Sequence, residues 1–169
     1  HTGHDLAVGI NIQGRKSVSG METMNARDVA ECWILGDVNK DKAAKLRVMG
    51  EDMVLEIPFN ESGKTEDGHF RRYTGKREIE GFVDTAFAAE KSVRLVSAEY
   101  VVSEDGRTVF VEARGEVEMV SGKIYRNRYV LRFDVEHGKI KCLREFYNPI
   151  TSAVAFGRPI AGQVTLDSL

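Results

Sequence analysis

The segment LREFYNP, residues 143–149, places one carboxylic acid, Glu145, between bulky apolar residues. Because side chains of a strand alternate between its two faces, Glu145 shares a face with Leu143 and Tyr147. A carboxylate on an apolar face is costly unless it is paired, hydrogen-bonded or protonated, and functional sites retain such costs most readily. Glu145 is therefore either a general acid or base in a pocket, or one half of a structural ion pair. The candidate partners for such a pair are Arg128 and Arg144.

Other residues of the same segments have types that suit a pocket for a carbonyl compound. Tyr129 and Tyr147 can hydrogen-bond a carbonyl or polarise an enolate, or they are strand residues whose hydroxyls reach the surface. Asn127 either orients a ligand or is a structural amide. Several large apolar residues suit a pocket wall or a plain core; they are Trp33, Met49, Phe82, Phe87 and Leu143.

Several classes of chemistry lack their signatures in this chain. Of the four histidines, His1 and His4 lie in the predicted leader, His69 in the polar loop and His137 at a hairpin turn. There is no Gly-rich phosphate loop, GxSxG element or metal-ligand spacing. We therefore expect neither a metal nor an organic cofactor. Cys32 and Cys142 form no CxxC pair, which favours a reduced, cytoplasmic protein. A formal charge of -2 and the absence of a long apolar run argue against nucleic acid and membrane as partners.

The periodicity of the chain changes from helical to strand-like near residue 92. Helices are expected at 25–36, 40–50 and 76–91, with a strand at 52–59 and a polar loop at 60–75. Four strands separated by glycine-containing turns are expected at 93–103, 108–120, 123–135 and 139–147. This order predicts an α+β fold, in which the helices pack on one face of a curved antiparallel sheet.

The length of 169 residues fits one domain, predicted at 21–169. Residues 1–20 show no clear period and are expected to be a leader or an N-terminal arm. Met21 and Met24 are candidate native starts.

Alternation also assigns the two faces of the strands. One face is predicted to lie under the helices; it carries Val109, Val111, Ala113, Gly115, Val117, Met119, Asn127, Tyr129, Leu131, Phe133, Val135, Lys141, Leu143, Glu145 and Tyr147. The other face mixes apolar side chains with acidic and basic ones on neighbouring strands. It suits a homodimer interface through Phe110, Arg128, Val130 and Phe146, or a solvated face with weak ion pairs.

The run from Arg126 to Gly157 resembles the C-terminal half of the phenazine biosynthesis A/B proteins, in the SnoaL-like, nuclear transport factor 2-like superfamily. The shared residues are Asn127, Tyr129, Phe133, Gly138, Ile140, Lys141 and the REF-x-NP element at Arg144, Glu145, Phe146, Asn148 and Pro149. The resemblance implies a cone-shaped α+β barrel, a homodimer joined through the sheet, and a pocket whose glutamate, matching Glu145, acts as general acid. Where that family has a histidine at the start of the third helix, this chain has Lys76, a candidate substrate contact.

Together these features predict a small cofactor-independent enzyme of secondary metabolism. It would act by general acid/base catalysis on a cyclic or polyketide-like ketone in a hydrophobic pocket, as an isomerase, cyclase or condensing enzyme. The alternative is a non-catalytic dimer of the same fold that binds a hydrophobic small molecule, because the fold alone does not decide between them.

Overall fold

The computed structural model of the chain describes residues 23–160, so the predicted leader at 1–20 lies outside the described residues. Within these residues, four helices and six strands follow one another. They are α1 (Ala26–Val38), α2 (Lys42–Val48), β1 (Met49–Ile57), β2 (Arg71–Thr74), α3 (Gly75–Ala89), β3 (Glu90–Val102), β4 (Thr108–Met119), β5 (Ile124–Glu136), β6 (Lys139–Tyr147) and α4 (Pro149–Phe156). The predicted α+β class is confirmed.

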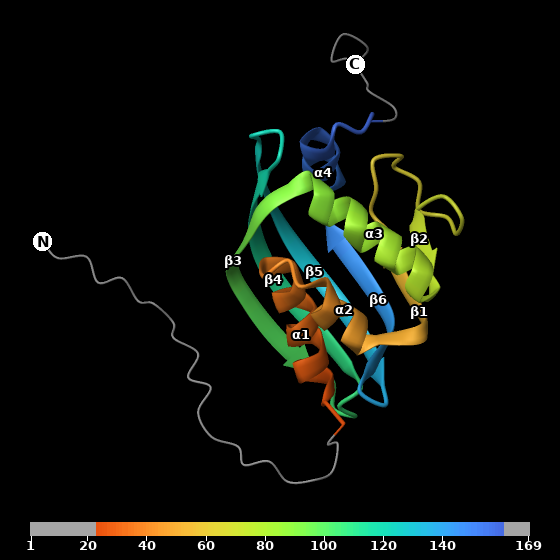
Figure 1. The fold of residues 1–169 in the computed structure, drawn as a ribbon. Coiled ribbons are helices and arrows are strands. Elements are labelled where there is room, and N and C mark those ends of the chain that lie inside the picture. The colour runs from red at the N-terminus through yellow and green to blue at the C-terminus, as the bar shows by residue number, and fades with distance from the viewer. Residues whose placement is uncertain (1–22, 161–169) are drawn as a thin grey trace, which may run out of the picture.

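The six strands form one curled, unclosed sheet in the order β2-β1-β6-β5-β4-β3. The predicted meander of β3 to β6 is antiparallel, but β1 runs parallel to β6, so the sheet as a whole is mixed. In Figure 1, α1, α2 and α3 lie on the concave side of the sheet, and α4 lies at one end of it. This is the cone predicted from the sequence.

The first three helices follow their local signals. Asn25 caps α1 by accepting a hydrogen bond from the Asp28 amide at 2.8 Å, and Asp41 caps α2 through the Ala44 amide at 3.0 Å. In α3, Ile79 and Val83 are buried, as the 3.6-residue period predicts. These helices cover a core that includes the fully buried Trp33, Phe133, Met49, Met53, Leu55 and Leu143.

Two elements and one detail of register differ from the prediction. The polar loop at 60–75 ends in the short edge strand β2, and the residues after the NP dipeptide form α4, with Pro149 in its first turn and Asn148 as its cap. A bulge between β5 and β6 shifts the alternation, so Ile140 is buried and Lys141 is exposed, contrary to the predicted face of Lys141.

Candidate functional site

A cavity of about 640 Å³ lies between the concave face of the sheet and the helices. Residues from α1, α3, β2 to β6 and the α4 region line it. Most of its wall is apolar, including Phe82, Val83, Val93, Leu95, Ala113 and Val117. The size suits a small organic molecule of one to a few rings.

Glu145 of β6 lines this apolar cavity, on the face that the alternation predicts. Burial raises the pKa of its carboxyl group to about 7, and the nearby carboxylate of Asp37 adds to the increase. The positive charges of Lys45 and Arg71 act in the opposite direction. Near neutral pH this carboxyl group can therefore both give and take a proton.

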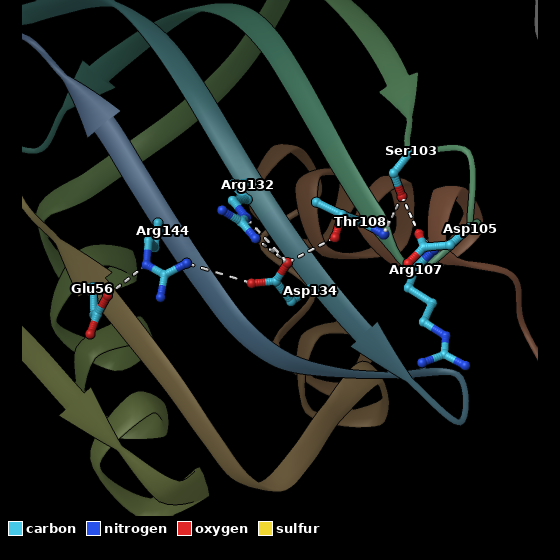
Figure 2. Close-up of polar contacts among 8 residues, drawn as sticks. All are labelled: Glu56, Ser103, Asp105, Arg107, Thr108, Arg132, Asp134 and Arg144. Atoms are coloured by element: carbon cyan, nitrogen blue, oxygen red, sulfur yellow. Dashed lines mark hydrogen bonds and ion pairs between the residues drawn. The ribbon is translucent and has the colours of Figure 1, made fainter.

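The alternative that Glu145 forms a structural ion pair is wrong for both predicted partners. Arg144 points to the other face of β6, where its Nε lies 2.8 Å from Glu56 and its Nη1 lies 3.6 Å from Asp134 (Figure 2). Arg128 is exposed, and within residues 23–160 neither arginine forms an ion pair with Glu145. Adjacent residues of one strand thus project into two separate environments.

A second carboxyl group, Glu90 at the start of β3, also lines the cavity, and burial raises its pKa to about 7. Asp37 and the buried Lys45 form an ion pair beside it. Gly36 allows this arrangement, because a Cβ atom there would lie 2.4 Å from the Cγ atom of Lys45. The cavity therefore has an acidic end built by α1, α2 and β3.

Three tyrosines, Tyr125, Tyr129 and Tyr147, also line the cavity. Tyr129 and Tyr147 pack edge to face with ring centroids 5.7 Å apart, and Tyr129 donates to the hydroxyl oxygen of Tyr125 at 3.3 Å. Burial raises the pKa of Tyr147 to about 12 and the pKa of Tyr129 well above its ordinary value. Both hydroxyl groups therefore keep their protons at neutral pH and serve as hydrogen-bond donors.

The residues predicted to contact substrate divide into two groups. Phe82 lines the cavity together with the predicted catalytic residues Glu145, Tyr129 and Tyr147. The others lie elsewhere: Trp33, Met49 and Leu143 are in the core, Phe87 packs against that core, Lys76 pairs with Glu51, and Asn127 lies outside the cavity wall. For these six residues the structure supports structural roles.

Asn127 is the structural amide of the two predicted alternatives. Its Nδ2 donates to the hydroxyl oxygen of Tyr125 at 2.8 Å and to the carbonyl of Asn148 at 3.0 Å, and its Oδ1 accepts from the Asn148 amide at 3.1 Å. These bonds join β5 to the start of α4. Asn127 thereby fixes one end of the cavity and the ring of Tyr125.

Sequence reasoning missed several polar residues of the cavity wall, among them Asp37, Lys45, Arg71, Glu90 and Arg158. Each lies near the end of an element or in a polar stretch, where a charged residue is usually solvated. Only the strand alternation of RRYT could have placed Arg71 on an inner face, and it required β2 to be recognised first.

Three features are absent from the described residues: a metal-binding cluster, a membrane-spanning helix and a disulfide. Within 23–160, no three histidine, cysteine or acidic side chains are grouped as a metal site would require. The described helices include none long and apolar enough to cross a membrane. Cys32 and Cys142 are both partly buried and carry free thiols.

The fold and its cavity define a cone of the nuclear transport factor 2-like type. The model of the SnoaL-like domain family matches residues 21–143, so the chain belongs to this family. None of the curated proteins matches the chain.

Solved structures show the same fold at low sequence identity. A candidate isomerase from Bacillus subtilis is 22% identical with a TM-score of 0.66, covering 80% of this chain and 94% of its own. A candidate polyketide cyclase from Pseudomonas putida is 18% identical with a TM-score of 0.66, covering 78% and 98%. A phenazine biosynthesis-related protein from Pseudomonas aeruginosa is 18% identical with a TM-score of 0.61, covering 85% and 97%.

Proposed function

We propose that the protein is a cofactor-independent enzyme that isomerises, cyclises or condenses a cyclic or polyketide-like ketone in its cavity. The observation that carries this proposal is the carboxyl group of Glu145, unpaired in an apolar cavity and with its pKa raised to about 7. A group of that pKa can donate a proton to a carbonyl oxygen or remove one from the adjacent carbon.

The tyrosines supply the second part of the proposed chemistry. Arg71 Nη2 donates to the hydroxyl oxygen of Tyr147 at 2.6 Å, which leaves the hydroxyl proton of Tyr147 free for a substrate oxygen. A donor fixed in a largely apolar cavity stabilises the charge that develops on that oxygen. Gly115 makes room for Tyr129, because a Cβ atom there would lie 3.3 Å from its Cε2.

The REF-x-NP element and the phenazine biosynthesis-related neighbour support a role in secondary metabolism. The candidate isomerase and polyketide cyclase support the same class of reaction by likeness of fold. In this proposal the ketone binds with its carbonyl group between Glu145 and Tyr147.

The test is Glu145→Gln, which keeps the shape of the side chain and removes its proton. A panel of cyclic and polyketide-like ketones supplies the substrates to assay. Turnover should fall roughly 10²- to 10⁴-fold, while the dissociation constant of the ketone changes little. Arg144→Gln, on the opposite face of the same strand, is the matched control and should keep full turnover. Unchanged turnover in Glu145→Gln would contradict the proposal, and weaker binding alone would indicate the non-catalytic alternative.

We also propose that the outer face of the sheet forms a homodimer. Its apolar side chains are unusually exposed: Phe59 by 52%, Phe110 by 42% and Val130 by 43%. A hollow of about 650 Å³ is lined by Phe59 and Val130 together with arginines and glutamates of β3 to β5. A second copy would cover the apolar area and match acidic side chains with basic ones.

Sedimentation tests the dimer directly. The protein should sediment as a dimer at micromolar concentration, and Val130→Glu should convert it to a monomer because it buries a charge in the interface. Val154→Glu, at an exposed position of α4, is the control and should remain a dimer. A monomeric parent protein would contradict the proposed interface.

A further inference from the structure

Arg71 is directed into the cavity by the pairing of the edge strand β2. Arg71 lies opposite Ile57 and Tyr73 lies opposite Leu55, both fully buried residues of β1. The intervening Arg72 is exposed and pairs at 3.7 Å with Glu56 on the outer side. Two consecutive arginines therefore occupy opposite faces, and only Arg71 lines the cavity.

The guanidinium of Arg71 has few protein partners. Its Nη2 donates to the hydroxyl oxygen of Tyr147, while its Nε is buried without a hydrogen-bond acceptor. Within residues 23–160 it forms no ion pair with a carboxylate. A partly buried guanidinium with unused donors is costly unless another acceptor completes it.

Two carboxyl groups act on Arg71 through their charge, Glu61 and Glu145, and within residues 23–160 neither forms an ion pair with it. The Oε2 atom of Glu61 is buried without a hydrogen-bond partner, as is Nε of Arg71. Glu61 accepts a hydrogen bond from Arg158 Nε at 2.9 Å, and Arg158 Nη2 donates to Ser152 Oγ at 2.6 Å. Arg71, Arg158 and Glu61 together hold two positive charges and one negative charge. When Glu145, whose pKa is raised to about 7, is protonated, this end of the cavity has an excess of one positive charge.

We propose that Arg71 binds a carboxylate group of the substrate, so that the ketone acted on is a largely apolar molecule carrying one carboxylate. A guanidinium presents its donors as a planar fork that fits a carboxylate through two parallel hydrogen bonds. The single excess charge matches a monoanion, and the apolar wall of Phe82, Val83 and Leu95 accommodates the rest of the ligand. This assignment of substrate class rests on the proposed function of the same cavity.

The position of Arg71 also connects it to the proposed acid. Arg71 and Glu145 both lie beside Tyr147, and the charge of Arg71 lowers the pKa of Glu145. A carboxylate bound to Arg71 would neutralise that charge. Substrate binding would then favour the protonated Glu145 that a general acid requires.

Two matched probes test the proposal without turnover: 1-naphthoate and the neutral 1-naphthalenemethanol, titrated calorimetrically at pH 7. The parent protein should bind naphthoate roughly 10- to 100-fold more tightly than the alcohol, as expected for hydrogen bonds to a charged group. Arg71→Met should remove this preference and leave the affinity for the alcohol unchanged. Arg72→Met is the control and should keep the preference.

Equal affinity of the parent protein for the two probes, no binding of naphthoate, or a preference that survives in Arg71→Met would overturn the proposal. Arg71→Lys, which keeps the charge without the fork, should show an intermediate preference and provides the same test if Arg71→Met does not fold. Because the probes are bound and not turned over, the two proposals can fail separately. A loss of turnover in Glu145→Gln with no carboxylate preference would refute this inference and leave the proposed function standing.

Discussion

The two faces of β6 differ in how their charged side chains are paired. On the outer face, Arg144 lies between Glu56 and Asp134, and Asp134 also accepts from Arg132 and from Thr108 Oγ1 at 2.9 Å (Figure 2). At the turn before β4, Asp105 accepts hydrogen bonds from Ser103 Oγ at 2.6 Å and from the backbone amide of Arg107 at 3.0 Å (Figure 2). On the inner face, Glu145 forms no ion pair within residues 23–160, although the charges of Lys45 and Arg71 act on it.

The charged side chains on the outer face are paired with one another, whereas the carboxyl group of Glu145 lies in an apolar cavity. A carboxylate with a cation beside it stays ionised, because the partner stabilises its charged form. The apolar cavity raises the pKa of Glu145 to about 7, so its carboxyl group is partly protonated near neutral pH. The difference between the faces is one of solvation and pairing, since the residues belong to the same strand.

Truncation of Leu143, a fully buried residue two positions before Glu145 on β6, should have the largest effect on stability. Leu143→Ala should lower the free energy of unfolding by about 2 to 5 kcal/mol, because it leaves a cavity in the core. Urea unfolding measures this loss. A loss below 1 kcal/mol would mean that Leu143 lies beside the cavity and not in the packed core.

The free energy of unfolding should depend on pH more strongly through Glu145 on the inner face than through the ion pairs of the outer face. The pKa of Glu145 is raised from 4.5 to about 7 on folding, so its favourable contribution is complete below pH 4.5 and is lost as the pH rises through 7. Relative to Glu145→Gln, the parent protein should therefore lose about 3 kcal/mol of stability between pH 4.5 and pH 8. Urea unfolding of both proteins across this range measures the difference. A constant difference would contradict a buried, unpaired acid.

Breaking the outer network should have the smallest effect. Arg144→Gln should cost about 1 kcal/mol, because Glu56 and Asp134 each keep another arginine nearby and remain in contact with water. Its cost should decrease as salt is added, since exposed ion pairs are screened. A loss as large as that of Leu143→Ala would contradict the contrast between the two faces.

Much of the fold was predictable because local signals and global packing agree. The strong alternation of β4 and β5 fixed which side chains face the helices, and the period of Ile79 and Val83 fixed α3. The strand β2 was not predicted, because four residues of mixed polarity in a polar stretch carry little periodic signal. The helix α4 was missed although Asn148, Pro149 and Gly157 are ordinary start and stop signals.

The candidate site was predictable only along the strands. Alternation placed Tyr129, Glu145 and Tyr147 together on the inner face, and the cavity contains all three. Lys45 and Glu90 could not be placed, because their position depends on how α1 and α2 pack and where β3 begins. For the same reason Trp33 and Met49 could not be divided between core and pocket: both are large apolar residues, and only the packing decides.

The proton affinity of Glu145 tests the central claim most directly. Carboxyl carbons can be labelled and titrated by NMR, with the resonance of Glu145 assigned from its absence in Glu145→Gln. Glu90 titrates in the same range, so Glu90→Gln is needed to separate the two groups. We predict a midpoint near 7 for Glu145. A midpoint near 4.3, the ordinary value of a solvated glutamate, would contradict the account of Glu145 as a buried general acid.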